Sequence, residues 1–229
     1  MFALEDCEPD LLTLLPVLLK KASKVIAKLS PMVDISHTLE LLPNTTEVHI
    51  LSVHNECKEM LFIIKRNTEC DDTKVKCVNY TTQNIEESFS FIFQKEKSVK
   101  PSFSEKVYSY LYEPNASILK GGAFKCVGEY YGVQKLHVSS HLYTSEIQIE
   151  NFPGRTFVVE DVISFSGKDI KQLGKRIPKA NITVRNFPLS VEELRKRTKI
   201  MDGGDIYLFA TTLFDGEKVL IKCRKLMRG

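Results

Sequence analysis

Basic side chains gather around a predicted corner between a strand and a helix in the last third of the sequence. Arg185 and Asn186 close an alternating apolar run, and a short predicted helix follows Pro188. Guanidinium and ammonium groups in this arrangement can bind phosphate groups. A helix surface that simply faces water is the alternative interpretation of the same charges. The basic positions of the helix are Arg195, Lys196, Arg197 and Lys199.

Positive charge is also dense upstream of this corner. Between Lys168 and Lys199 the sequence has ten basic and three acidic residues, spread over two predicted helices and the strand between them. Arg155, Arg185 and Arg195 are the strongest candidates for defined contacts, because one guanidinium can bind two phosphate oxygens in one plane. The complete set of predicted phosphate contacts is Arg155, Lys175, Arg176, Arg185, Asn186, Arg195, Lys196, Arg197 and Lys199.

The net charge of the chain hides an asymmetry between its two parts. The 229 residues carry a formal charge of +3. Residues 1–154 have 16 basic and 20 acidic side chains, whereas residues 155–229 have 16 basic and 9 acidic ones, which gives −4 and +7. Because polyanion binding depends on clustered positive charge, we expect a polyanion to bind mainly to the second part.

Other kinds of chemistry have little support in the sequence. The five histidines lack the spacing of a metal site, and no nucleophile elbow or phosphate-binding P-loop is found, so we expect no metal and assign no catalytic residue. The six cysteines are widely spread without a secretory leader, which indicates reduced thiols in a cytoplasmic protein. The longest apolar run, Leu11–Leu19, is too short to span a bilayer, so no membrane association is expected.

The first part of the chain is predicted to mix helices and strands. A leucine-rich helix is expected to start at Pro9 and to be covered on both sides. A strand at Lys24–Leu29 and a helix at Asp34–Leu42, capped by Asp34, follow it. The apolar runs Val48–Val53 and Met60–Ile64 are separated by six polar residues and predict a β-hairpin.

The middle of the chain is predicted to be rich in strands. Strands are expected at Lys74–Tyr80 and Ser88–Gln94, and one continuous helix is expected at Ala116–Tyr130. Gly121 and Gly122 weaken that helix by about 1 kcal/mol each relative to alanine. They are therefore expected to permit a close backbone approach.

The last third has the clearest pattern, which predicts the order βαβαββ. Ser190 and Glu193 have the spacing of a capping box, and Asp215-Gly216 is a strong signal for a hairpin turn. The aromatic residues of these strands alternate with aliphatic ones and are expected in the core. The predicted elements are a strand at 156–165, a helix at 168–177, a strand at 182–187, a helix at 191–199, and strands at 206–213 and 219–224.

Several longer blocks, in order along nearly the whole chain, together resemble one family. They are ALEDCEPD, KLSPMVD, HNECKE, YLYEPNASILKGGAF, HLYTS, FPGRTF, KANITVRNFPLS and DGGDIYLFATT. The chain resembles bacterial class I S-adenosylmethionine-dependent methyltransferases that carry a ferredoxin-like insert and a THUMP-like domain after the catalytic domain. The family's glycine-rich cofactor loop and the Asp-Pro motif after its fourth strand have no counterpart here.

The resemblance implies a fold class of α/β plus α+β. Residues 1–68 are expected to form the C-terminal half of a class I methyltransferase sheet. Residues 69–154 would be a ferredoxin-like and connecting segment, and residues 155–229 a THUMP-like domain. In this arrangement the strand at Lys24–Leu29 exposes an open sheet edge, through which the chain is expected to self-associate.

The resemblance also implies a function in RNA modification. The chain would be the C-terminal portion of a methyltransferase, inactive alone, with the basic THUMP-like domain positioning tRNA or rRNA. S-adenosylmethionine (SAM) would be the cofactor of the full-length family, bound outside this chain. The alternatives are a non-catalytic RNA-binding or assembly module and a protein-interaction domain. Four residues are candidates for a substrate pocket, with helix capping or chain reversal as alternative roles: Ser30, Asp34, Asn55 and Glu56.

Overall fold

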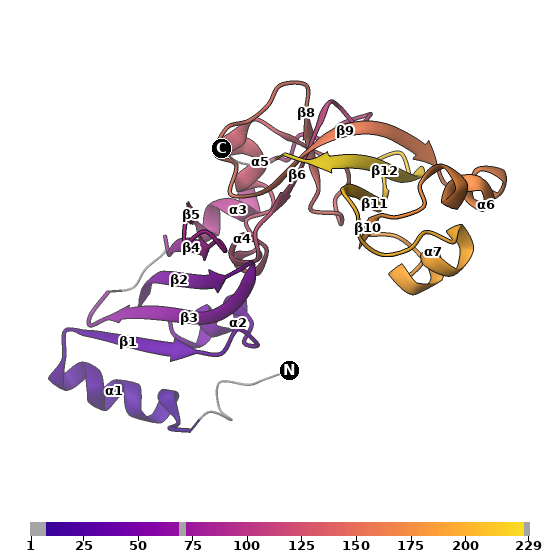
Figure 1. The fold of residues 1–229 in the computed structure, drawn as a ribbon. Coiled ribbons are helices and arrows are strands. Elements are labelled where there is room, and N and C mark those ends of the chain that lie inside the picture. The colour runs from indigo at the N-terminus through magenta and orange to yellow at the C-terminus, as the bar shows by residue number, and fades with distance from the viewer. Residues whose placement is uncertain (1–7, 69–71, 227–229) are drawn as a thin grey trace. The chain divides into compact units, whose positions relative to one another are not determined.

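The computed structural model describes residues 8–68 and 72–226, and the chain divides into two compact units (Figure 1). The first unit comprises residues 1–99 and 115–127, and the second comprises residues 100–114 and 128–229. The chain therefore leaves the first unit, enters the second, and returns once before it completes the second. Cys7 and Cys70 lie outside the described residues.

A five-stranded mixed sheet forms the centre of the first unit, in the order β1-β3-β2-β4-β5. The predicted β-hairpin is confirmed, since β2 and β3 pair antiparallel, and β2 also pairs in parallel with β4. Its buried apolar residues include Val48, Ile50 and Phe62, which are fully shielded from solvent. The strands are β1 (Lys24–Leu29), β2 (Thr45–Val53), β3 (Glu56–Lys65), β4 (Lys74–Tyr80) and β5 (Glu86–Ile92).

Helix α1 (Leu11–Lys21) departs from the prediction at its start and in its burial. Asp10 caps it, because its carboxylate accepts hydrogen bonds from the backbone N–H groups of Leu12 and Thr13, so Pro9 precedes the helix. None of its residues is buried, and the expectation that both sides are covered is wrong. No described helix is long and apolar enough to cross a membrane.

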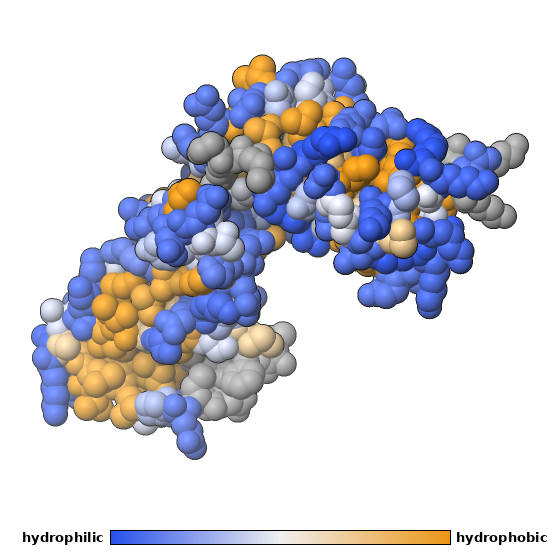
Figure 2. All heavy atoms as spheres, in the orientation of Figure 1, coloured by the Kyte–Doolittle hydropathy of each residue, from blue (hydrophilic) through white to orange (hydrophobic). Residues whose placement is uncertain are grey.

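An apolar surface lies over α1 and the strand that follows it (Figure 2). Val17 is 51% exposed and Ile26, on β1, is 57% exposed. Strand β1 pairs with β3 on one side only and forms an edge of the described sheet, as predicted. We call this surface the α1–β1 face; its exposed apolar residues are Leu14, Val17, Leu18, Ile26 and Met32.

The single helix predicted for residues 116–130 is two helices in the structure. Gly122 has a positive φ of 72° and ends α4 (Ala116–Gly121) in the left-handed conformation that favours glycine. Helix α5 (Cys126–Tyr131) follows. Gly121 permits a close approach, as predicted, because an added Cβ would lie 2.9 Å from Sγ of Cys77 on β4. The remaining helices of the first unit are α2 (Ile35–Leu41) and α3 (Phe93–Ser98), of which α3 was not predicted.

The second unit contains a seven-stranded sheet in the order β10-β11-β12-β9-β6-β8-β7. Within it, β10 and β11 are parallel and the other neighbours are antiparallel. Glu113 on β6 lies directly opposite Arg155 on β9. The strands are β6 (Tyr110–Pro114), β7 (Gln134–Lys135), β8 (Tyr143–Ser145), β9 (Gly154–Ser164), β10 (Asn181–Arg185), β11 (Ile206–Thr212) and β12 (Lys218–Lys225).

The predicted order βαβαββ is confirmed from β9 to β12, with α6 (Gly167–Arg176) and α7 (Val191–Thr198) as the two helices. Ser190 and Glu193 form the predicted capping box at the start of α7. A core of aliphatic side chains joins the helices to the sheet, and Leu173, Leu194 and Leu208 are among its buried members. Both helices are therefore packed against the sheet through this core.

Candidate nucleic-acid interface

The corner between β10 and α7 has the predicted strand-to-helix geometry. Asn186 adopts a positive φ of 51°, which turns the chain directly after Arg185. The hydroxyl of Thr212 on β11 donates a hydrogen bond of 2.7 Å to the carbonyl oxygen of Asn186 and fixes this turn. The Thr212 hydroxyl thus holds the corner through the backbone of Asn186, and the side chains of Arg185 and Asn186 are left for other interactions.

Two of the predicted arginines converge on one carboxylate. Glu113 has a side chain that is only 4% exposed, and its Oε2 accepts a hydrogen bond of 2.8 Å from Nε of Arg155, with a second, short contact from the same guanidinium. An Nη of Arg185 lies 2.8 Å from the other oxygen, Oε1, as an ion pair outside hydrogen-bond alignment. Side chains from β6, β9 and β10 therefore meet at Glu113.

His137 lies beside the same corner, in the loop between β7 and β8. The backbone N–H of Ser139 donates to Nδ1 of His137 at 3.0 Å, so Nδ1 is an acceptor and the neutral ring carries its proton on Nε2. The side-chain nitrogen of Asn186 lies 2.9 Å from the same Nδ1. These contacts orient the imidazole so that Nε2–H is its available donor group.

Burial sets the charge of a second histidine in this loop. Burial is the main cause that lowers the pKa of His141 to about 4, and the positive charges of Lys135 and Arg185 act in the same direction. His141 is therefore neutral at physiological pH. The cations that contact Glu113 are the guanidinium groups of Arg155 and Arg185.

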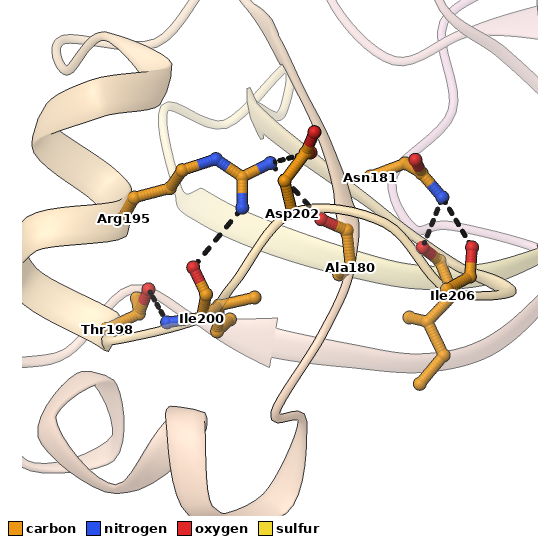
Figure 3. A network of polar contacts seen from close by, with 8 residues as sticks. Ala180, Asn181, Arg195, Thr198, Ile200, Asp202 and Ile206 are labelled. Atoms are coloured by element: carbon orange, nitrogen blue, oxygen red, sulfur yellow. Dashed lines mark hydrogen bonds and ion pairs between the residues drawn. The ribbon is translucent and has the colours of Figure 1, made fainter.

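Arg195 is engaged within the fold (Figure 3). Its guanidinium donates to the carbonyl oxygens of Ile200 and Ala180, each at 3.2 Å, and forms a short ion pair with Asp202. These contacts connect α7 to Ala180, the residue before β10, and to the loop that precedes β11. In the same view Asn181 donates to the carbonyl oxygen of Ile206. Arg195 thus contacts the residue before β10, whereas Arg185 is the last residue of that strand.

The remaining predicted contacts lie on exposed positions of α6, α7 and the residue after α7. Arg176 lies 3.5 Å from a carboxylate oxygen of Asp161, a surface ion pair of small energetic weight. The two helices are close together at Gly174, where an added Cβ would lie 2.2 Å from the carbonyl oxygen of Thr198. The exposed basic residues are Lys175, Arg176, Lys196, Arg197 and Lys199.

The aromatic side chains near Arg155 belong to the core. Phe157 and Phe209 are fully buried, and the Arg155 guanidinium carbon lies 5.4 Å and 6.0 Å from their ring centroids. Phe187 and Tyr207 are partly buried and pack on the core clusters. Phe157 and Phe209 thus support Arg155 through cation–π contact.

The four candidate pocket residues lie in or next to two turns of the first unit. Ser30 and Asp34 follow β1, where the Asp34 carboxylate caps α2 by accepting a hydrogen bond of 2.9 Å from the N–H of His37. Asn55 lies in the turn between β2 and β3, and Glu56 is the first residue of β3. Because Leu29 at the end of β1 pairs with Met60 near the start of β3, the end of β1 and this turn lie at the same end of the sheet.

Asn55 has a defined structural contact in that turn. Its side-chain oxygen accepts a hydrogen bond of 2.8 Å from the backbone N–H of Ala116, the first residue of α4. The backbone N–H of Asn55 donates to the side chain of Asn79, which donates in turn to the buried Glu87. Glu56 is exposed and pairs with Lys58 at 2.7 Å. The turn therefore holds the start of α4.

Two residues of the interface were not predicted. Glu113 precedes Pro114 in the strand β6, and His137 lies in the loop between β7 and β8. Their roles depend on pairing between distant segments, as in the register of Glu113 with Arg155. The one local signal was a charged residue at an inward position of an apolar strand, which requires a partner when buried.

Comparison with known families assigns the class of the two domains that carry this interface. Residues 110–153 match the family described as a ferredoxin-like domain, and residues 154–225 match the family described as THUMP domain-like. The chain therefore carries a ferredoxin-like domain followed by a THUMP-like domain, in agreement with the predicted fold class. No curated protein matches the chain.

A particular solved structure is similar to the chain as a whole. It is the crystal structure of a candidate methyltransferase from Porphyromonas gingivalis W83, with 43% sequence identity and a TM-score of 0.93. The similarity covers 99% of this chain and 57% of that chain. The chain thus spans little more than half the length of that relative. The similarity supports the predicted link to methyltransferases.

Proposed function

We propose that this chain is the C-terminal portion of an RNA-modifying, SAM-dependent methyltransferase whose second unit positions tRNA or rRNA. The observation that carries the proposal is the convergence of Arg155 and Arg185 within a THUMP-like domain that has a net positive charge. Guanidinium groups held by a fold can fix the register of an RNA through its phosphates, without reading its sequence.

The first unit is proposed to be the closing part of the catalytic domain. Its open β1 edge and its exposed α1–β1 face are the features expected where further parallel strands and a helix join a sheet. The matched relative is longer than this chain, which agrees with an additional α/β portion as the occupant of this face. Ser30, Asp34, Asn55 and Glu56 would lie at the substrate side of that sheet.

SAM is the proposed cofactor of the complete protein, to which it supplies the transferred methyl group. Binding of SAM by the resembled family uses a glycine-rich loop. The first glycine of this chain is Gly121, which ends a helix, so the strands and loops before it contain no such loop. The residues before Gly121, which include the proposed catalytic portion, therefore do not fit the cofactor. We expect calorimetric titration of the chain with SAM to give no micromolar binding, and micromolar affinity would overturn this part of the proposal.

We also propose a cytoplasmic location for the protein. Cys57, Cys77 and Cys223 are free thiols, which agrees with a reducing compartment. Burial raises the pKa of Cys77 and of Cys223, so both remain protonated at physiological pH. These thiols are thus core residues of the two sheets.

The RNA part of the proposal is tested by binding of labelled tRNA to the chain at increasing salt concentration. Phosphate contacts release counterions, so the logarithm of the association constant should fall linearly and steeply with the logarithm of the salt concentration. Fluorescence anisotropy measures this slope. No binding at low salt, or binding that does not respond to salt, would contradict the proposed role.

A further inference from the structure

We propose that Glu113 is a positioning residue that holds Arg155 and Arg185 as one clamp for an RNA backbone phosphate. The inference rests on the proposed function and specifies which atoms of the second unit contact the RNA. It also separates two kinds of positive charge, namely guanidiniums with a fixed orientation and the exposed basic residues of α6 and α7. Only the contribution of the oriented guanidiniums to RNA affinity is expected to depend on geometry.

The clamp is built from three strands. Glu113 on β6 pairs in register with Arg155 on β9, and Arg185 ends β10. The carboxylate is buried and has one guanidinium on each oxygen. Since both arginines contact the same carboxylate, their charged groups are neighbours with a net charge of +1 for the three residues. A buried carboxylate thus brings two like charges together, which would otherwise repel each other.

Both guanidiniums retain donors for a ligand. Arg155 uses Nε and one Nη on Glu113, and its side chain is still 32% exposed. Arg185 uses one Nη on Glu113 and the other on the carbonyl oxygen of Val184, and it is 40% exposed. A guanidinium has five N–H donors, so Arg155 and Arg185 each have N–H groups left over. A phosphate accepts several such bonds at once, in the geometry that guanidiniums favour.

The surroundings of the clamp supply further donors. Nδ1 of His137 accepts from the backbone of Ser139, which leaves Nε2–H as a donor beside the corner. The amide of Asn186 is oriented by the same ring nitrogen. The residues grouped here therefore combine cationic and neutral donors around an acidic group that is already paired. This composition favours an anion.

The test compares two models that predict opposite signs. If the arginines act only as diffuse charge, Glu113→Gln removes a negative charge and strengthens tRNA binding. If Glu113 positions them, the same substitution releases both guanidiniums and weakens binding about tenfold, the scale of one charge-assisted hydrogen bond. Anisotropy with labelled tRNA, on protein whose fold is verified by circular dichroism, measures the difference.

A second variant keeps the proposal testable if Glu113→Gln fails to fold. The double substitution Arg155→Lys with Arg185→Lys keeps the charge but removes the planar donors. We expect affinity for tRNA to fall about tenfold with an unchanged salt slope. Arg224→Lys, at an exposed arginine on β12 that pairs with Glu160 and is not a predicted phosphate contact, is the matched control and should bind as the unaltered chain does.

The outcomes separate this inference from the proposed function. Wild-type affinity in the double lysine variant, or equal or tighter binding by folded Glu113→Gln, would overturn the clamp while RNA binding itself stands. Absence of salt-sensitive tRNA binding by the unaltered chain would overturn the proposed function and the clamp with it. Weaker binding by both variants, with unaltered binding by the Arg224→Lys control, supports the positioning role.

Discussion

Gly174 on α6 lies against the carbonyl oxygen of Thr198 at the end of α7, so closely that a Cβ on Gly174 would be 2.2 Å from that oxygen. The contact is between two backbones, which cannot yield as the end of a flexible side chain can. It sets the distance between the two basic helices of the THUMP-like domain. Gly167, at the start of the same helix, has no atom within 4 Å of an added Cβ.

Gly174→Ala is therefore expected to destabilise the second unit. Overpacking typically costs about 1–3 kcal/mol, and here it opposes the stabilisation of about 0.5–1 kcal/mol that alanine normally gives in a helix. Thermal unfolding followed by circular dichroism should show a lower transition temperature. Gly167→Ala is the matched control and should be neutral or slightly stabilising; equal stability of the two variants would contradict the close contact.

The pH dependence of stability is expected to include a contribution from His141. Its pKa is about 4 in the folded chain and about 6.5 when unfolded, so protonation favours the unfolded state. The contribution of His141 to the free energy of unfolding is fully present above pH about 6.5 and is lost as the pH falls towards about 4. We expect this loss to be about 1–2 kcal/mol after allowance for partial exposure. Urea unfolding across this range, compared with His141→Gln, should give a flatter profile in the variant. An NMR titration midpoint of the ring near its ordinary value would rule this out.

Asn55 is expected to contribute more to stability than its neighbour Glu56. Asn55→Ala removes the acceptor for the Ala116 N–H and places alanine at a positive φ of 63°, which together cost about 1–2 kcal/mol. Glu56→Ala alters an exposed ion pair and should change stability by less than about 0.5 kcal/mol. Chemical denaturation of both variants checks this order, and a reversed order would favour a binding role for Asn55 over a structural one.

The α1–β1 face is expected to make the isolated chain self-associate. Val17→Lys combined with Ile26→Thr places polar groups on two positions that are more than half exposed, and should shift the chain towards monomer. Ile85→Thr is the control, because Ile85 is also exposed but precedes β5 at the opposite edge of the sheet. Sedimentation velocity measures the shift. If the unaltered chain stays monomeric at high concentration, the α1–β1 face does not drive self-association and this prediction is contradicted.

Regular elements were predictable from local patterns. The strands β1 and β4 have the predicted bounds, and the predicted capping box at Ser190 and the predicted cap at Asp34 are present. These features depend on neighbouring residues, which a sequence displays directly. The break of the helix at Gly122 was missed, because a glycine pair is equally compatible with a weak helix and with a left-handed cap.

The interface was less predictable, because its geometry comes from strand pairing. Arg155 and Arg185 were selected for their chemistry, but their shared partner Glu113 became visible only through the register of β6 with β9. Arg195 has the same chemistry and lies in a similarly basic segment, yet its guanidinium contacts carbonyl oxygens of its own fold. The sequence identifies these side chains as hydrogen-bond donors, but only the fold shows which acceptor each one contacts.

Hydrogen exchange of the chain with and without tRNA tests the central claim most directly, because it locates the RNA on the molecule. The account predicts slower exchange in the second unit, at the loop with His137, at the corner between β10 and α7, and along α6. Protection confined to the first unit, or no protection at tRNA concentrations that saturate binding, would contradict the proposal that the THUMP-like domain positions RNA.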